Sequence, residues 1–166
     1  MELTLTIPGE PCAQGRPRFS TAGGFVKAYD PDKSRNYKAY VKMCAIKSMQ
    51  EQGWKCTESP LSIEITAFMS IPASKSKKFK QAAIVGAERP TKKPDVDNVF
   101  KILTDALSGI AYKDDKQIVS AFISKYYADE PRVDIFIKAV QAAIKASLSS
   151  SGMRCRSMRR SHSNEN

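Results

Sequence analysis

An acidic stretch in the second half of the chain holds the residue types that could carry out chemistry. Asp95 and Asp97 are spaced i, i+2, Lys101 follows one helical turn later, and a second acidic pair comes at Asp114 and Asp115. Mg²⁺ binds through a few carboxylates, keeps several waters and is completed by substrate phosphate oxygens. Carboxylates that converge from a helix start and a following turn would therefore suit metal-dependent phosphodiester hydrolysis, with a lysine to stabilise the developing charge.

Each part of this pattern also has an ordinary structural explanation. Acidic residues are favoured at a helix start by the macrodipole. Asp97 with Lys101 is a common i, i+4 pair worth ~0.2 to 0.5 kcal/mol, and Asp-Asp is common in turns. Spacing alone leaves both interpretations open.

Histidine and cysteine usage narrows the chemistry. The only histidine, His162, lies in a polar tail, so metal or acid–base chemistry in the body must use carboxylates, lysines or tyrosines. The four cysteines have irregular spacing and no CxxC pair, which favours reduced, unpaired thiols over a zinc module or a disulfide framework. They are Cys12, Cys44, Cys56 and Cys155.

The charge balance indicates a polyanionic partner. The chain has 27 Lys and Arg against 17 Asp and Glu, a net charge of +10. The tail beyond Ser149 holds four arginines and one glutamate, so the body keeps a net charge of about +7. Basic charge alone also suits a membrane surface or simple solubility. No apolar run reaches the ~20 residues of a membrane span, and the N-terminus shows no signal peptide, so a cytoplasmic location and no membrane partner are expected.

Two basic segments are candidates for DNA contact. The first, near residues 12–30, mixes arginine and lysine with aromatic residues, which suits phosphate contact and base stacking. A solvated basic loop explains it equally well. The second is a lysine-rich connector at residues 74–93, which is either a substrate-gripping arm or a flexible loop. The predicted DNA-binding residues are Arg16, Arg18, Lys27, Lys92 and Lys93.

Apolar periodicity predicts the elements that position these residues. The first half of the chain is predicted to form a strand at residues 2–7, a short hairpin turning at Gly23-Gly24, a helix from an N-cap at Ser34 to about Gln52, and a strand at residues 61–71. The second half is predicted to form a short helix around residues 77–85, a helix from Asp95 or Asp97 to Gly109, and strands at residues 117–127 and 132–140. These last two strands are predicted to pair as an antiparallel hairpin. On the helix after Asp95, an apolar arc of Val99, Ile102, Leu103, Ala106 and Leu107 opposes Asp97, Lys101, Thr104 and Asp105.

This order of elements predicts a two-layer α+β domain with a mixed sheet and helices packed on it. The order is strand, basic loop, helix, strand, basic connector, helix, strand, strand. The domain is expected to cover residues 1–148, and residues 149–166 form a basic Ser/Arg-rich tail of low complexity that is expected to be disordered.

The acidic stretch resembles the RusA family of Holliday junction resolvases. The residues that carry the resemblance are DVDNVFKILTDAL, then Gly109, then YKDDKQIV. EPRVDIFI and the opening IPGEPCAQGRPRF are also similar to that family, so the resemblance covers roughly Leu3 to Val140. The longer lysine-rich connector and the Ser/Arg tail depart from the compact family pattern.

The resemblance implies a homodimeric endonuclease that makes paired nicks in four-way DNA junctions, in recombination and repair. It implies Mg²⁺, or Mn²⁺ in its place, as the cofactor. By position, Asp95, Asp97 and Asp115 match the metal-binding catalytic carboxylates and Lys101 matches the catalytic lysine. Asp114 matches a neighbouring acid whose role stays open.

Two other function classes stand beside this one. The first is a branched-DNA binding protein without catalysis, carried by charge and aromatic residues alone. The second is a metal-dependent transferase of the DxD type, for which the sequence shows no nucleotide-binding fold.

Overall fold

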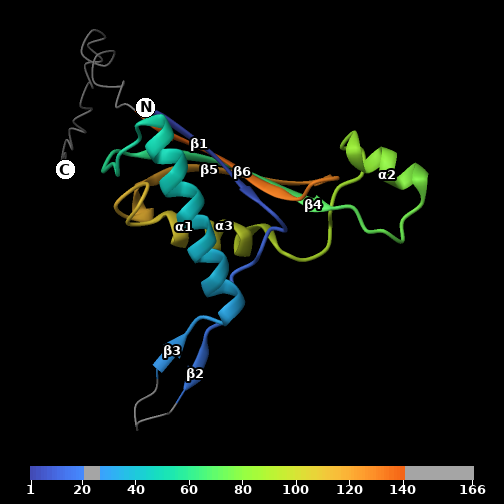
Figure 1. Ribbon diagram of the computed structural model, residues 1–166, viewed down its shortest axis with the longest axis horizontal. Helices are drawn as coiled ribbons and strands as arrows, with labels where there is room; N and C mark the ends of the chain where they lie inside the picture. The colour runs from blue at the N-terminus through green and yellow to red at the C-terminus, as the bar shows by residue number, and fades with distance from the viewer. Residues whose placement is uncertain (21–26, 141–166) are drawn as a thin grey trace, which may run out of the picture.

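The computed structural model describes residues 1–20 and 27–140, in which two helices cover one face of a mixed sheet (Figure 1). The predicted two-layer α+β fold is confirmed. The elements are β1 (Glu2–Pro8), β2 (Arg18–Ser20), β3 (Lys27–Tyr29), α1 (Asp32–Gln52), β4 (Leu61–Ser70), α2 (Lys77–Ile84), α3 (Val96–Leu107), the 3₁₀ turn η1 (Asp115–Gln117), β5 (Ile118–Ala128) and β6 (Arg132–Ala139).

The main sheet has the strand order β1-β6-β4-β5. β6 pairs antiparallel with β1 and β4, whereas β4 and β5 are parallel. The connection from β4 to β5 passes through α2 and α3, as a parallel pair requires a long crossover. The start of α3 therefore returns toward the end of the sheet at which β4 finishes.

The predicted antiparallel hairpin of residues 117–127 and 132–140 is wrong, because β4 lies between β5 and β6. Ile65 of β4 pairs with Ile123 on one side and with Ile135 on the other. The residues between β5 and β6 cross the end of β4, a width of about 10 Å at ~4.8 Å per strand. β6 takes the inner position because its core-facing residues are completely buried, whereas most of the first half of β5 is exposed at the sheet edge.

The core forms between the inner face of the sheet and the apolar sides of α1 and α3. Alternate residues of β1, β4 and β6 are buried, which confirms the period-2 pattern predicted for these strands. The predicted apolar arc of α3 is completely buried. Thr104, which was placed on the polar arc, is also buried, and its hydroxyl donates to the Phe100 carbonyl at 3.0 Å. That bond inside the helix lets a polar side chain lie in the core.

Helix α1 begins three residues earlier than predicted. Pro31 occupies the N-cap position, and its fixed φ of −55° suits a helix start. Ser34, predicted as the N-cap, instead lies inside the first turn, buried, where its hydroxyl accepts a hydrogen bond from Gly15. The predicted end of the helix is confirmed, since Gly53 follows with a left-handed φ of 66°.

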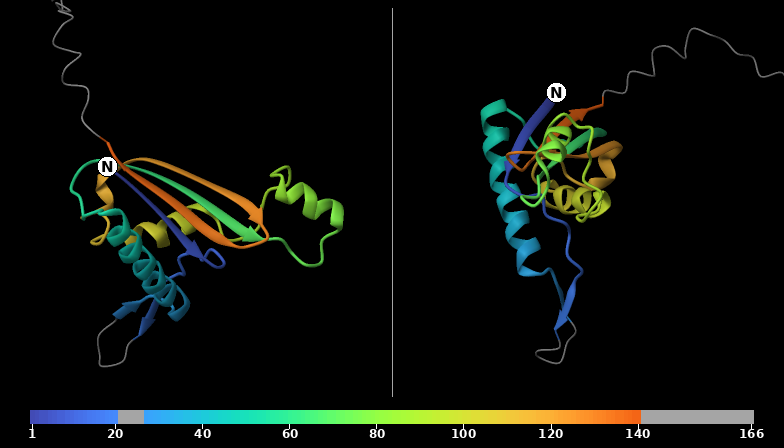
Figure 2. Two further views of the ribbon diagram at one scale, coloured as in Figure 1. Left: turned by 45° about the horizontal axis from the view of Figure 1, so that its top comes forward. Right: turned by 90° about the vertical axis from the view of Figure 1, so that its right-hand side faces the viewer.

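The basic loop forms the predicted short hairpin, with Arg18 of β2 opposite Tyr29 of β3. This hairpin extends away from the sheet in both views (Figures 1 and 2). The predicted turn at Gly23-Gly24 and the predicted tail of residues 149–166 lie outside the described residues. Within residues 1–20 and 27–140, no helix is both long and apolar enough to cross a membrane.

Candidate active site

The first acidic pair lies at the start of α3. Asp95 occupies the N-cap position, but its side chain makes no capping hydrogen bond, and Asp97 lies in the first turn. Both side chains are exposed. The positive end of the helix dipole favours these carboxylates. Because the helix does not use the Asp95 carboxylate as a cap, its oxygens stay accessible to a ligand from solvent.

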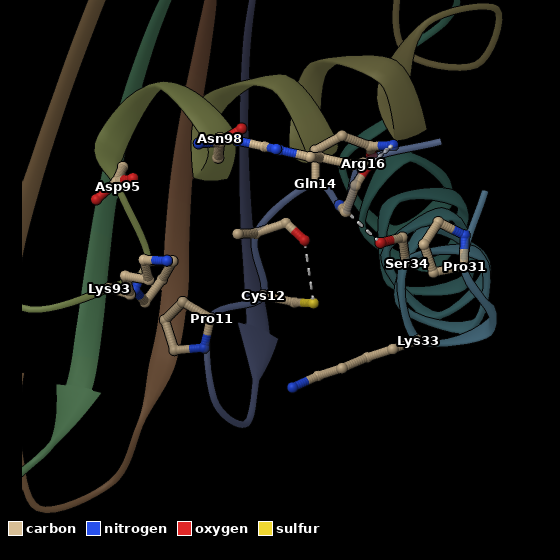
Figure 3. A pocket seen from close by; sticks show the side chains of 13 residues that line it. Pro11, Cys12, Gln14, Arg16, Pro31, Lys33, Ser34, Lys93, Asp95 and Asn98 are labelled. Atoms are coloured by element: carbon tan, nitrogen blue, oxygen red, sulfur yellow. Dashed lines mark hydrogen bonds between the residues drawn. The ribbon is translucent and has the colours of Figure 1, made fainter. Parts of the chain in front are cut away.

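An open cleft of about 560 Å³ lies beside Asp95 (Figure 3). Its walls come from residues 11–16, from the start of α1, and from residues 93–95 with Asn98. Arg16, Lys33 and Lys93 reach it from these three segments, and Lys93 lies next to Asp95 (Figure 3). Three cations around one carboxylate suit a phosphodiester, since arginine and lysine bind phosphate oxygens.

Hydrogen bonds hold the basic loop between α1 and α3. The Gln14 backbone N–H donates to the Asn98 carbonyl at 3.0 Å, which fastens the loop to α3. The Gly15 N–H donates to the Ser34 hydroxyl at 2.9 Å, which fastens it to α1. A Cβ on Gly15 would lie only 2.9 Å from both Pro31 and Ser34, so this close approach requires glycine. The loop that carries Arg16 therefore has a defined path along the cleft.

Replacing Ser34 with alanine tests this attachment. We expect Ser34→Ala to lower the free energy of unfolding by about 1 to 2 kcal/mol, because the partly buried Gly15 N–H loses its acceptor. Urea unfolding of the full chain measures the effect. The matched control is Ser120→Ala on the exposed edge strand, which should change stability by less than ~0.5 kcal/mol. Equal stability of the two variants would contradict the role given to Ser34.

A charged cluster next to the cleft joins α1 to α3. The Lys38 ammonium bridges Asp30 at 2.9 Å and Asp105 at 3.0 Å. The hydrogen bond from Lys38 lowers the pKa of Asp30. Burial by itself would lower the pKa of Lys38, but the bonds to the two carboxylates raise it above its ordinary value. Gln14 also donates to Asp30 at 2.9 Å, so the cluster supports the cleft wall as well as the helix pair.

Lys101 is exposed on α3, one turn after Asp97. Its charge contributes to the lowered pKa of Asp30, so its ammonium lies near the charged cluster. Among the described residues, neither Lys101 nor Asp97 takes part in an ion pair. The common i, i+4 pair is therefore not formed; the Asp97 carboxylate instead accepts a hydrogen bond from the Asn98 side chain at 3.5 Å.

Strand β5 holds the segment that leads into α3. The Lys125 ammonium donates to the carbonyls of Lys92 at 3.0 Å and Pro94 at 2.9 Å. Lys92 and Lys93 are exposed, but of these two only Lys93 lines the cleft. The backbone directly before Asp95 is thus anchored to the sheet.

The second acidic pair has two different environments. The Asp114 carboxylate accepts the Lys116 backbone N–H at 3.0 Å as the cap of η1, and this bond lowers the pKa of Asp114. Asp115 is exposed. Burial raises the pKa of Tyr112, and the charge of Asp115 raises it further. The Tyr112 hydroxyl donates a hydrogen bond to the Thr104 carbonyl in the second half of α3. The structure therefore gives Asp114 a local structural role as a cap, whereas Asp115 is exposed beside it.

The structure places Asp115 apart from the pair at the start of α3. Ile118 next to η1 and Lys125 beside Pro94 are seven residues apart on β5, about 23 Å at ~3.3 Å per residue. In the part of the chain that the structure describes, no three acidic, histidine or cysteine side chains are gathered as metal ligands. One protomer thus places Asp95 and Asp97 at the start of α3 and Asp115 at the other end of β5.

The remaining predicted DNA-binding residues, Arg18 and Lys27, open the strands of the hairpin that follows Arg16. Sequence reasoning missed Gln14, Lys33 and Asn98 in the cleft, and the cluster of Asp30, Lys38 and Asp105 beside it. Asn98 lies within the DVDN run and Asp105 lies two turns after Asp97, which are the signals that could have identified them. No sequence pattern distinguishes Lys33 from other surface lysines.

The cysteines in the described residues are free, as predicted: Cys12, Cys44 and Cys56. Cys12 lines the cleft, and burial raises the pKa of its thiol. A raised pKa leaves little thiolate, so Cys12 is a packing residue there. Cys155 lies outside the described residues.

Two comparisons with known proteins give matches over most of the chain. The sequence model of endodeoxyribonuclease RusA matches residues 8–138. The uncharacterized protein YqaN of Bacillus subtilis strain 168 is 43% identical over 142 residues, which cover 84% of this chain and 98% of YqaN. The family match at residues 8–138 contains the acidic stretch, the basic loop, β4 and β5, and β6 up to Lys138.

Proposed function

The chain belongs to the RusA family of endodeoxyribonucleases, and on this premise we propose that it resolves four-way (Holliday) DNA junctions by paired, Mg²⁺-dependent phosphodiester cleavage. The proposed biological setting is DNA recombination and repair. The observation that carries this proposal is the cleft at the start of α3, whose wall contains Asp95 together with Arg16, Lys33 and Lys93.

The carboxylates at the start of α3 fit a hard divalent cation, with Asp95 in the cleft wall and Asp97 outside it in the first helical turn. Asp95 and Asp97 offer only oxygen ligands, they are exposed, and neither is used in an ion pair with a described residue. Mg²⁺ needs few protein carboxylates, because water and substrate phosphates fill its other positions. We therefore assign Asp95 and Asp97 as the residues that hold Mg²⁺ or Mn²⁺.

The basic residues of the cleft, and Lys101 on α3 outside its wall, act on the DNA backbone. Arg16, Lys33 and Lys93 bind phosphate oxygens and orient the strand to be cut. Lys101 stabilises the negative charge that develops on the phosphate as the P–O bond breaks. The bound ion supplies Lewis acidity for the attack of water. Anchoring by Lys125 and by the Lys38 cluster keeps these groups in place during the reaction.

We also propose that a homodimer completes each site. The family resemblance assigns Asp115 to the metal site, yet within one protomer it lies next to the first residue of β5, whereas the start of α3 lies beside Lys125, about 23 Å along that strand. An Asp115 carboxylate can join Asp95 and Asp97 only from a second copy. A symmetric dimer would form two such sites, which suits the paired nicks of junction resolution.

Removal of the metal tests the proposed chemistry. We expect the protein to cut a synthetic four-way junction in Mg²⁺ or Mn²⁺, and EDTA to abolish cleavage while junction binding remains. Gel analysis of end-labelled junctions measures cleavage, and a mobility shift measures binding. Cleavage that persists in EDTA would contradict the metal mechanism. Binding without cleavage in Mg²⁺ would instead identify a non-catalytic branched-DNA binding protein.

A further inference from the structure

Helix α2 extends beyond the end of the sheet and takes no part in the cleft. Both views show it past the point where β4 ends (Figures 1 and 2). The helix is formed locally, since the Ser76 hydroxyl caps it by accepting the Phe79 N–H at 3.3 Å. We name residues 71–92, which leave β4 and return toward α3, the α2 arm.

Contacts with β5 attach the α2 arm to the sheet. The Phe79 and Tyr127 rings meet edge to face, with their centroids 5.9 Å apart. The Arg89 guanidinium stacks over Tyr126 at 3.4 Å and donates to the Lys125 carbonyl at 2.7 Å. Such aromatic and cation–π contacts are each worth on the order of 1 kcal/mol. The α2 arm is therefore docked near both of its ends.

The same strand residue connects the α2 arm to the active site. The Lys125 carbonyl holds Arg89, while the Lys125 ammonium holds the carbonyls of Lys92 and Pro94 directly before Asp95. A ligand held on α2 is thus held at a defined position relative to Asp95.

The positive charge of the α2 arm is concentrated around the start of α2, with Lys75 just before the helix and Lys77, Lys78 and Lys80 on it. Four lysines lie within six residues, and the first acidic residue after them is Glu88. Within the described residues, no ion pair involves any of the four. Uncompensated lysines on one projecting helix attract phosphate backbones. The lysines are Lys75, Lys77, Lys78 and Lys80.

We propose that α2 binds the phosphate backbone of a duplex arm leading away from the cleavage point. This inference rests on the proposed function and adds a second contact outside the cleft. Ile84 and Val85 are also exposed, at 55% and 78%. The surface of two side chains is far smaller than the ~800 Å² that each partner buries in a stable protein interface. The lysines, and not these two apolar side chains, therefore define the partner.

The test is a triple variant, K77Q/K78Q/K80Q, in the full chain and in a cleavage-deficient Asp95→Asn background. We expect its affinity for a four-way junction at about 0.1 M salt to fall on the order of 10²-fold, and the slope of log K against log salt to become shallower by about 2 to 3. Fluorescence anisotropy over a salt series measures both. Circular dichroism checks that α2 still folds, as the surface positions of its lysines lead us to expect.

A matched control removes the same charge elsewhere. Lys47, Lys55 and Lys138 lie toward the opposite end of the sheet, so their replacement with glutamine should change affinity less than ~3-fold. Equal affinities of the two triple variants would overturn the proposal. A changed oligomeric state in gel filtration, with unchanged DNA affinity, would also overturn it and identify α2 as a protein contact.

Cleavage by the protein without substitutions separates this inference from the proposed function. If that protein binds the junction in a lysine-dependent way but never cuts it, the nuclease proposal fails and the α2 contact stands. If that protein cuts the junction but the α2 variant binds as tightly as the control, the α2 contact is overturned and the nuclease proposal stands. If it neither binds nor cuts the junction, both are overturned.

Discussion

Asp95→Asn is expected to lower Mg²⁺-dependent cleavage of a four-way junction by more than ~10²-fold. Loss of a residue that only orients a metal ligand typically costs ~10 to 100-fold, so loss of a ligand itself should exceed that. Junction binding should stay the same or become slightly tighter, because the substitution removes a negative charge from a cleft that receives phosphate. Single-turnover cleavage and a mobility shift in Ca²⁺ measure the two effects.

The matched control for this variant is Asp129→Asn, which removes an exposed carboxylate from the turn between β5 and β6. It should leave cleavage within ~2-fold of the original rate. Cleavage by Asp95→Asn at the control rate would show that the site assignment is wrong. Loss of junction binding together with cleavage would place Asp95 in substrate recognition and not in the chemistry.

Mixing two inactive variants is expected to restore cleavage. Asp95→Asn and Asp115→Asn should each be inactive as homodimers. In a mixed dimer, however, the Asp95–Asp97 pair of one protomer meets an intact Asp115 from the other. With random exchange, about a quarter of the sites of an equal mixture should be complete. Each mixed dimer has one working site, so the product should be a junction nicked on one strand.

The two variants are mixed and allowed to exchange subunits before the junction is added. The control is each variant alone, at twice the concentration that it has in the mixture. If Asp115 served the site of its own protomer, every site in the mixture would lack a carboxylate and no activity would return. Paired cleavage by the mixture would also contradict a single complete site per mixed dimer. Gel filtration of the protein without substitutions establishes the dimer on which this test depends.

Local sequence patterns predicted the helices and strands well. When one face of a helix or strand is buried, apolar residues recur along the chain with the period of that element. The alternation in β4 and the apolar arc of α3 both match the buried residues. The failures come from partners that are distant in the chain. The short link between β5 and β6 has the composition of a hairpin turn, but β6 is inserted beside β4 because its core-facing side must be covered. Ser34 has the type of an N-cap, but its hydroxyl bonds Gly15, 19 residues earlier.

The sequence by itself determined the residue chemistry of the proposed site: two carboxylates, a lysine one turn later, a net basic charge and no histidine in the body. Those are properties of residue type and short spacing. Only the tertiary structure decided which residues share a cleft, since Arg16, Lys33 and Lys93 come from separate segments. It also separated Asp114, which caps a turn, from Asp115, and placed Asp115 apart from Asp95. The reason is geometric: η1 precedes β5, whereas the start of α3 lies beside Lys125 in the second half of the same strand, and the extended strand keeps the two regions apart.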